Sequence, residues 1–308
     1  MSELRVNVII PTYKPDRKLD LCLAMLKRQS VKPEKILLIN TEESLFKSKV
    51  FPGLPGGEIV HIKKEEFDHG GTRNRAAAMC DCDVILLLTQ DAVPADTDLI
   101  RNMLKPFEDE EVCAVYGRQM ADRKDNIIEA YTRRFNYPAE SRIKSAEDLP
   151  ELGIKTFFCS NVCAAYRKSV YDRLGGFPLH TIFNEDMIFA SRLIEDGKKI
   201  AYAADARVWH WHNYTAWQQL TRNFDLAVSQ VDAGGLFDRV SSESEGIRMV
   251  KSTIAYLIRI RRPDLIPKLI IHSAAKYIGY LLGKNYRRLP AGLIKRISLN
   301  PSYWSNHE

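Results

Sequence analysis

The sequence predicts an α/β fold in which helices flank a mostly parallel central sheet, followed by a basic helical extension. Short apolar runs alternate with longer segments of helical periodicity, which is the pattern of successive βα units. Residues 84–88 (VILLL) are apolar throughout, as is typical of a central strand buried on both faces. The apolar runs end on polar residues, and ligands bind at the carboxyl ends of strands in such sheets.

Residues 5–10 (RVNVII) and 35–39 (KILLI) are the first two predicted strands, and the apolar positions between them predict a helix. Because parallel strands bring their ends to one crevice, this pattern suggests a nucleotide-binding half-domain. The alternative is that the polar residues after the strands only cap helices. These polar residues are Thr12 and Tyr13 after the first strand, and Asn40, Thr41 and Glu42 after the second.

A third strand is predicted at 59–62, before the segment 67–75 (FDHGGTRNR) that opens a helix. The paired glycines Gly70 and Gly71 allow a backbone to approach a ligand closely. Arg73, in the first helical turn, adds a fixed positive charge beside them. This segment is informative because it shortly precedes the central strand.

The central strand carries Thr89, Gln90 and Asp91 at its carboxyl end, and we expect Pro94 to stop it. A lone carboxylate in this position suits a hard cation and the diphosphate that such a cation bridges. The alternative is that Asp91 only caps the next helix.

The second half of the chain continues the alternation, with an irregular charged stretch at 122–152. Glu185 and Asp186 stand at the amino terminus of a predicted helix, where the helix dipole favours carboxylates even without a function. His210 and His212 alternate along the end of the last predicted strand, so they offer two imidazoles on one face, although packing is the alternative. The other predicted elements are helices at 99–107, 167–174, 187–195 and 217–231 and strands at 112–116, 156–165, 200–205 and 206–209.

The composition is that of an ordinary globular protein, with 308 residues of which 45% are hydrophobic and 27% charged. A chain of this length can form one large α/β domain with an appendage. The six cysteines lack paired metal-site spacing, so we expect free thiols in a reducing compartment. The amino terminus lacks the pattern of a signal peptide, which predicts a cytoplasmic protein.

The net charge of +6 is distributed unevenly. Residues 247–296 contain twelve Lys and Arg against one acid, Asp264, whereas the remaining residues include 33 basic and 38 acidic ones. Such a stretch can bind nucleic acid or an anionic membrane, or it can be a solvated helix face. Its tyrosines fall on apolar helical faces, which disfavours nucleic acid.

Apolar residues recur at helical spacing through 247–296, but Lys268, His272 and Lys276 interrupt any run long enough to span a bilayer. We therefore predict a peripheral anchor at the inner face of the cell membrane, attracted by the anionic leaflet. The alternative is a helical pair that packs on the catalytic domain or on a second copy of the chain, which would form a homo-oligomer.

Residues 6–212 resemble the family 2 glycosyltransferases, which are inverting enzymes of the GT-A fold. The features that match are the opening strand with its Pro11-Thr12-Tyr13 end, the acidic end of the second strand, the Asp91 strand and the block 167–210. Segments 67–74 and 89–92 are most similar to bacterial rhamnosyltransferases of surface polysaccharide synthesis, which use dTDP-L-rhamnose. The resemblance implies a GT-A catalytic domain, which we place at 1–240, before the basic amphipathic extension at 241–308.

The resemblance also implies roles for the polar residues. Asp186 would be the catalytic base, and Asp91 would hold Mg²⁺ or Mn²⁺ on the diphosphate, with His210 or His212 completing the ligand set. The family's usual Asp-x-Asp motif stands here as Gln90-Asp91-Ala92, without its outer carboxylates. The nucleotide pocket would be lined by Thr12, Tyr13, Asn40, Thr41, Glu42, Gly71, Arg73 and Gln90.

An inverting transfer needs one base to deprotonate the acceptor hydroxyl as it attacks the anomeric carbon. The expected partners are a nucleotide sugar donor and a saccharide or lipid-linked saccharide acceptor. A sugar nucleotidyltransferase would share the sheet, but it normally has a Gly-rich basic loop after the first strand, and residues 11–17 contain no glycine. A catalytically silent, membrane-associated scaffold of a polysaccharide assembly complex is the non-enzymatic alternative.

Overall fold

The computed structural model describes residues 4–122, 126–234 and 243–305, which form two compact units. The first unit takes the described residues within 1–121, 137–179 and 185–211, and it contains all the strands. The second takes those within 122–136, 180–184 and 212–308 and is helical. The predicted domain boundary between residues 240 and 241 lies outside the described residues.

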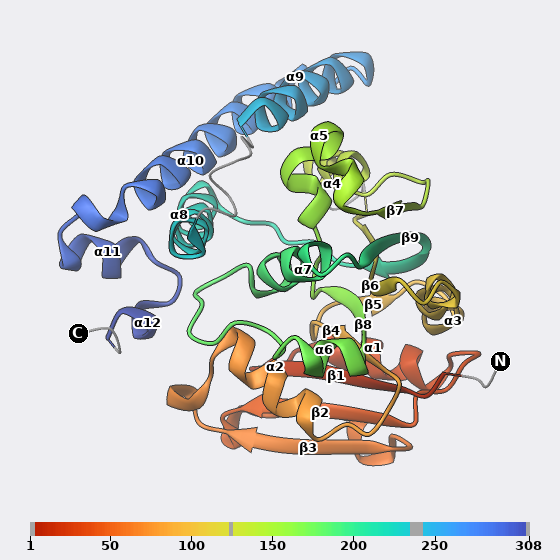
Figure 1. The fold of residues 1–308 in the computed structure, drawn as a ribbon. Coiled ribbons are helices and arrows are strands. Elements are labelled where there is room, and N and C mark those ends of the chain that lie inside the picture. Colours follow the sequence, from red (N-terminus) through yellow and green to blue (C-terminus); the bar gives the residue numbers. More distant parts are fainter. Residues whose placement is uncertain (1–3, 123–125, 235–242, 306–308) are drawn as a thin grey trace. The chain divides into compact units, whose positions relative to one another are not determined.

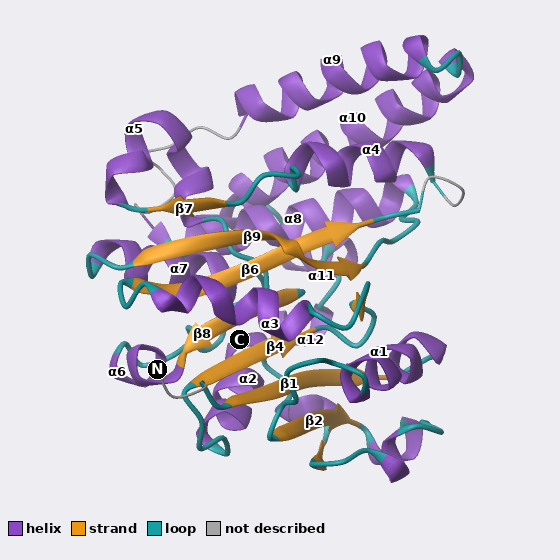
Figure 2. Cartoon of the chain, turned by 90° about the vertical axis from the view of Figure 1, so that its right-hand side faces the viewer, coloured by secondary structure: helices purple, strands orange, loops and turns teal. Residues whose placement is uncertain are grey.

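The strands of the first unit form a single sheet (Figures 1 and 2). They span Val6–Tyr13 (β1), Lys35–Thr41 (β2), Gly57–Ile62 (β3), Val84–Leu88 (β4), Val93–Pro94 (β5), Val112–Met120 (β6), Arg142–Lys144 (β7), Cys163–Arg167 (β8) and Lys199–Trp209 (β9). Their order is β3-β2-β1-β4-β8-β6-β9-β5, and β7 pairs with β9. Strands β5, β7 and β8 are antiparallel to the other six strands, which all run in one direction. The predicted α/β class with a mostly parallel sheet is therefore confirmed.

Helices pack on the sheet through one apolar face each, as α1 (Arg17–Lys27) illustrates. The helix begins at Asp16, whose side chain accepts a hydrogen bond from the Lys18 N–H at 2.8 Å. Its buried residues Leu19, Cys22, Leu23 and Leu26 recur at three- and four-residue spacing. The other helices of this unit are α2 (His69–Ala78), α3 (Leu99–Leu104), α5 (Leu149–Leu152), α6 (Lys168–Arg173) and α7 (Glu185–Glu195).

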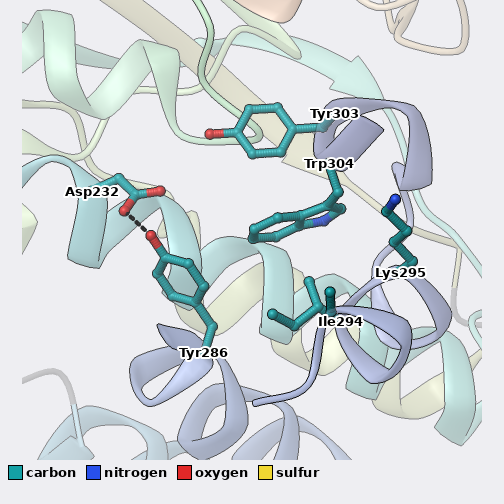
Figure 3. Close-up of a pocket in the computed structure, with 7 residues that line it drawn as sticks. Asp232, Tyr286, Ile294, Lys295, Tyr303 and Trp304 are labelled. Atoms are coloured by element: carbon teal, nitrogen blue, oxygen red, sulfur yellow. Dashed lines mark hydrogen bonds between the residues drawn. The ribbon is translucent and has the colours of Figure 1, made fainter. Parts of the chain in front are cut away.

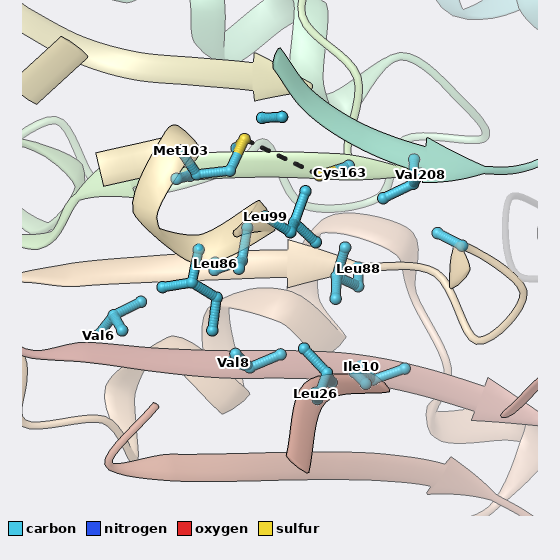
Figure 4. Close-up of a cluster of buried hydrophobic side chains, with 14 of the residues drawn as sticks. Val6, Val8, Ile10, Leu26, Leu86, Leu88, Leu99, Met103, Cys163 and Val208 are labelled. Carbon is cyan, nitrogen blue, oxygen red and sulfur yellow. Dashed lines mark hydrogen bonds between the residues drawn. The ribbon is translucent and has the colours of Figure 1, made fainter. Parts of the chain in front are cut away.

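The main hydrophobic core lies between the sheet and the helices α1 and α3. Figure 4 shows apolar side chains of β1 and β4 beside Leu26 of α1 and beside Leu99 and Met103 of α3. The six cysteines are all buried free thiols, as the sequence predicts. Because β1 and β4 share this core, their carboxyl ends are held next to each other at one edge of the sheet.

Some element predictions are wrong. Residues 156–165 do not form one strand, because β8 begins only at Cys163. Pro94 does not merely stop the central strand but pairs with Val208 as part of β5. One strand, β9, replaces the two predicted at 200–209, with an irregular register opposite Gly117. Since β9 ends at Trp209, His210 and His212 follow the strand and do not alternate along it.

The second unit consists of helices packed on one another. A capping box begins α8 (Ala216–Asp232), in which the Thr215 and Gln218 side chains each accept a hydrogen bond from the other residue's backbone. Helix α10 (Ile266–Lys284) packs along α8, and α9 (Glu243–Arg259) contacts α4 (Ile127–Asn136). The chain continues through α11 (Ala291–Ile297) and α12 (Pro301–Ser305). None of the described helices is long and apolar enough to cross a membrane.

Two glycines allow α10 to approach α8 closely. A Cβ atom on Gly279 would lie 2.1 Å from the carbonyl oxygen of Leu220, and one on Gly283 would lie 2.4 Å from that of Phe224. Because backbone atoms must move to accept a methyl group there, we expect Gly279→Ala to lower the free energy of unfolding by about 1–3 kcal/mol. Denaturant unfolding followed by circular dichroism measures this change.

Gly246 offers a matched control in α9, because a Cβ atom there would meet no atom within 4 Å. Gly246→Ala should leave the stability unchanged or raise it by up to about 1 kcal/mol, since alanine is the better helix former. Equal losses of stability in the two variants would contradict the close approach of α8 and α10.

Candidate functional site

The strand order reverses between β1 and β4. The chain proceeds from β1 through β2 and β3 on one side, and β4 then pairs with β1 on the other side. Ligands bind outside the carboxyl ends of the strands at such a reversal. Strands β6 and β9 run in the same direction as β4, whereas β8 runs against them. The residues after β1, β2, β4, β6 and β9 and those before β8 therefore lie at one edge of the sheet.

Gln90 joins the ends of β1 and β4. The backbone N–H of Tyr13 donates to Gln90 Oε1 at 3.0 Å, and Gln90 Nε2 donates to the Tyr13 carbonyl at 3.1 Å. The side-chain amide thus continues the pairing of the two strands beyond Leu88, the last residue of β4. Gln90, expected to line the nucleotide pocket, holds this edge of the sheet in register.

Asn40 fixes the end of β2. It is fully buried and accepts a hydrogen bond from Thr12 Oγ1 at 3.1 Å. Its Nδ2 donates to the Glu42 carbonyl at 3.1 Å and lies 3.0 Å from His61 Nδ1. Thr41 is buried beside it, and Glu42 has a φ of 65°, a left-handed conformation that non-glycine residues rarely adopt. Strained residues of this kind are concentrated at functional sites.

The paired glycines lie inside the first turn of α2. Asp68 caps this helix by accepting a hydrogen bond from the Gly71 N–H. A Cβ atom on Gly70 would lie 1.9 Å from the carbonyl oxygen of Pro178. Gly70 is therefore required by the protein's own backbone, whereas the sequence suggested the approach of a ligand.

Arg73 is buried and forms an ion pair with Glu185. Its Nη1 lies 3.3 Å from Glu185 Oε1, and each side chain is only 8% exposed. The same nitrogen donates to the His69 carbonyl at 2.7 Å, whereas Arg73 Nε has no hydrogen-bond partner among the described residues. Burial alone would raise the pKa of Glu185, but the charges of Arg73 and His69 lower it. Glu185 is therefore ionised and balances Arg73.

Asp186 has a different electrostatic setting from its neighbour Glu185. Its Oδ2 accepts a hydrogen bond from the Asn161 N–H at 3.0 Å, and its Oδ1 accepts one from the Met187 N–H at 2.8 Å. Burial and the Glu185 carboxylate raise the pKa of Asp186 to about 7. A carboxyl group with a pKa near neutrality is suited to general base catalysis. Adjacent carboxyls whose pKa values are pushed apart are typical of acid–base sites.

His210 follows β9 and is oriented by Gln119 from β6. Its Nδ1 lies 3.0 Å from Gln119 Oε1, and Gln119 Nε2 donates to Ser160 Oγ at 3.0 Å. The amide oxygen can only accept, so the neutral imidazole carries its proton on Nδ1 and a lone pair on Nε2. That Nε2 atom lies 3.6 Å from Asp91 Oδ2.

The pair Asp91 and His210 fits a divalent cation. A carboxylate oxygen and an imidazole nitrogen at this separation are ligands that suit Mn²⁺, and the carboxylate also suits Mg²⁺. The hydrogen bond from His210 to Gln119 is the kind of contact that fixes the orientation of a metal-binding histidine. His212 comes two residues later, as the first residue of the chain's return into the second unit.

Three site residues were missed by the sequence analysis, Gln119, Ser160 and Asn161. Besides its bond to Asp186, Asn161 donates from Nδ2 to Glu185 Oε1 at 3.1 Å and accepts from the Tyr166 hydroxyl at 2.9 Å. Its neighbour Ser160 accepts a hydrogen bond from Gln119, the residue that orients His210. These two residues therefore connect the candidate metal ligands with the two carboxyls. The signal for Ser160 and Asn161 in the sequence was two polar residues inside an apolar run.

Solved structures with a similar fold are those of glycosyltransferases. The mannosyltransferase PcManGT from Pyrobaculum calidifontis, in complex with GDP-Man and Mn²⁺, matches 99% of this chain and 85% of its own with a TM-score of 0.55 and 16% identity. TarS 1-349 of S. aureus, in complex with UDP-GlcNAc, matches 92% of both chains with a TM-score of 0.53 and 14% identity. These similarities concern the fold, and they confirm the predicted GT-A architecture.

Two relatives are similar in sequence over nearly their whole length. The O-antigen chain rhamnosyltransferase RfbN of Salmonella typhimurium (strain LT2) is 40% identical over 311 residues, which cover 98% of this chain and 97% of its own. The O-antigen chain rhamnosyltransferase WbaN of Salmonella anatum is 39% identical over 309 residues, which cover 97% of this chain and 96% of its own.

The family model described as "Glycosyltransferase like family 2" matches residues 4–225. This range contains every residue of the sheet edge described above. The resemblance and the enzyme class stated from the sequence are thereby confirmed. The chain belongs to glycosyltransferase family 2.

Proposed function

We propose that this glycosyltransferase transfers L-rhamnose from dTDP-L-rhamnose to a saccharide acceptor during O-antigen synthesis. The two O-antigen rhamnosyltransferases support this function, because about 40% identity extends over nearly the full length of both chains. The observation that carries the chemistry is the setting of Asp186, whose pKa is raised to about 7 at the ligand-binding edge of the sheet.

In the proposed reaction, Asp186 accepts the proton of the acceptor hydroxyl while that oxygen attacks the anomeric carbon of the donor. The bond between this carbon and the phosphate oxygen breaks on the opposite face, and the nucleotide diphosphate leaves. The N–H groups of Asn161 and Met187 hold the carboxylate in a fixed orientation. Inversion needs only this one base, and Glu185 is already paired with Arg73.

We propose Asp91 and His210 as ligands of Mg²⁺ or Mn²⁺, with His212 as a third candidate. The cation would neutralise the charge that develops on the leaving diphosphate. This assignment is supported by the lone pair on His210 Nε2 beside the Asp91 carboxylate. The proposed nucleotide pocket keeps the residues named from the sequence: Thr12, Tyr13, Asn40, Thr41, Glu42, Gly71, Arg73 and Gln90.

Donor specificity can be tested by screening sugar nucleotides with the purified protein. We expect dTDP-L-rhamnose to release nucleotide diphosphate at least about 100-fold faster than GDP-mannose or UDP-GlcNAc. Lipid extracted from an O-antigen strain that lacks this enzyme would supply the acceptor. A faster reaction with another sugar nucleotide would disprove the donor assignment and leave the family assignment intact.

The C-terminal extension, residues 241–308, is proposed to bind the anionic inner face of the cell membrane next to a lipid-linked acceptor. Helix α10 packs on α8 through one face and exposes a row of large apolar side chains on another. Basic residues occur throughout the same stretch, which suits a surface of anionic lipids. The exposed apolar residues of α10 are Ile270, Ile271, Tyr277, Ile278 and Leu281, each between 41% and 59% exposed.

Flotation with liposomes tests this anchor. The protein should bind anionic vesicles at low salt and be released by added salt, because each nearby basic residue contributes about 1 kcal/mol. The double substitution Ile271→Glu and Ile278→Glu should abolish binding, whereas Leu21→Glu, at an exposed position of α1, should not. Salt-independent association of the protein with itself in sedimentation, without vesicle binding, would instead indicate a homo-oligomer formed through these helices.

A further inference from the structure

A cavity of about 540 Å³ lies in the second unit, which is within the size range of small-molecule sites. Its walls come from the end of α8, from α11 and α12, and from the segment between α10 and α11. None of its residues belongs to the candidate functional site at the edge of the sheet. The cavity is lined by Asp232, Tyr286, Ala291, Ile294, Lys295, Tyr303 and Trp304 (Figure 3).

Three aromatic rings form much of the wall. The centroid of the Trp304 ring lies 5.5 Å from that of Tyr286 and 5.2 Å from that of Tyr303, with the latter pair at 85°. These rings pack against a buried cluster that includes Phe224 and Ile294, so their positions are fixed. Flat, rigid faces of this kind provide large apolar contact area next to polar groups, which suits the C–H face of a pyranose ring.

Polar groups stand beside these rings. The Tyr286 hydroxyl donates to Asp232 Oδ1 (Figure 3), and this oxygen also forms an ion pair with Arg287 at 3.2 Å. No described residue donates a hydrogen bond to the other carboxylate oxygen, Asp232 Oδ2. The indole nitrogen of Trp304 is buried and likewise has no acceptor among the described residues. Asp232 Oδ2 can therefore accept a hydrogen bond from a hydroxyl group of a ligand.

We propose that this cavity binds a pyranose ring of the saccharide acceptor chain, a ligand class that rests on the proposed function. One face of the sugar packs on the aromatic rings, and a ring hydroxyl donates to Asp232 Oδ2. An acyl chain would fill the same volume but would leave this carboxylate oxygen without a partner. The bound ring is one other than the ring that receives rhamnose, so the cavity retains a growing chain on the enzyme.

Saturation-transfer NMR on the full-length protein tests the proposal, with methyl α-L-rhamnopyranoside and methyl α-D-mannopyranoside as probes. Trp304→Phe keeps an aromatic ring but reduces the flat apolar surface, and we expect it to weaken glycoside affinity about 3- to 10-fold. Asp232→Asn keeps an acceptor for Tyr286 while removing the charge, and we expect a loss of similar size. Trp217→Phe is the matched control, because Trp217 is a 53% exposed residue of α8 outside the cavity, and it should bind like the wild type.

Absence of glycoside binding by the wild type would overturn the proposal, as would unchanged affinity in both cavity variants. Competition for the cavity by a lysophospholipid without any binding of the glycosides would assign it to an acyl chain instead. The sugar-nucleotide screen described above, run on the same samples, separates this proposal from the proposed function. If the cavity variants lose glycoside binding but the wild type is inactive with dTDP-L-rhamnose, the cavity proposal is supported and the donor assignment is refuted. If the wild type is active with dTDP-L-rhamnose but the variants bind glycosides as it does, only the cavity proposal is refuted.

Discussion

Asp186→Asn is expected to lower kcat by about 10²- to 10⁴-fold while leaving the affinity for the donor nearly unchanged, because the base acts on the acceptor and not on the nucleotide. The amide cannot take a proton from the acceptor hydroxyl, although it occupies the same volume. Steady-state kinetics gives kcat, and calorimetric titration with dTDP gives the donor affinity. Retained donor binding also shows that the variant is folded.

Asp196→Asn is the matched control for this substitution. Asp196 follows the last residue of α7 and pairs with Arg173 at the protein surface, where an ion pair contributes little. We expect wild-type kcat from this variant. If Asp186→Asn instead lost donor affinity in the same proportion as rate, Asp186 would be a donor-binding residue and the base would have to be sought elsewhere.

The raised pKa of Asp186 also determines the pH dependence of the reaction. As the pH falls through about 7, the carboxyl takes up a proton and can no longer accept one from the acceptor hydroxyl. We therefore expect log kcat/KM to fall with a slope of one below about pH 7 and to be level just above it. Glu185 stays ionised over this range because its pKa is lowered. An activity that is constant down to pH 5 would contradict the assignment of Asp186 as the base.

The sheet and most of its edge could be predicted because they depend on local patterns. Apolar runs of strand length alternate with helical periodicity, and the chemistry of a parallel sheet gathers at the carboxyl ends of its strands. This reasoning brings together Thr12, Asn40 and Asp91, which are far apart in the sequence. The amino-terminal position of Glu185 and Asp186 in α7 followed from periodicity in the same way.

The rest of the site depends on contacts that no local pattern encodes. The hydrogen bond that orients His210 comes from Gln119, 91 positions earlier, and the support of Asp186 comes from Asn161, 25 positions earlier. Gly70 looked like part of a ligand-binding turn, whereas its close neighbour is the Pro178 carbonyl of a distant segment. The difference between Glu185 and Asp186 is equally invisible in the sequence, because it arises from burial and from the position of Arg73.

Asp91→Ala is expected to weaken donor binding by at least about tenfold and to remove any dependence of activity on divalent cations, because Asp91 would hold the proposed cation that neutralises the diphosphate. The wild type should bind Mn²⁺ with an affinity that electron paramagnetic resonance can titrate, and the variant should not. This binding measurement does not depend on turnover. Asp96→Ala is the matched control, since Asp96 lies nearby in the sequence and pairs with Arg207 at the surface.

The motif Gln90-Asp91-Ala92, which lacks the outer carboxylates of Asp-x-Asp, makes the Asp91→Ala experiment decisive. With Gln90 and Ala92 in place of carboxylates, Asp91 is the only acid of the motif, so its loss leaves no neighbour in the motif to compensate. His210 would then keep its hydrogen bond to Gln119 and its buried position but would have no carboxylate at 3.6 Å to share an ion with. Wild-type turnover that persists in EDTA, together with equal donor affinity in Asp91→Ala, would mean that the leaving diphosphate is neutralised by protein cations alone. Arg73, whose Nε lacks a partner among the described residues, would then be the first residue to test in that role.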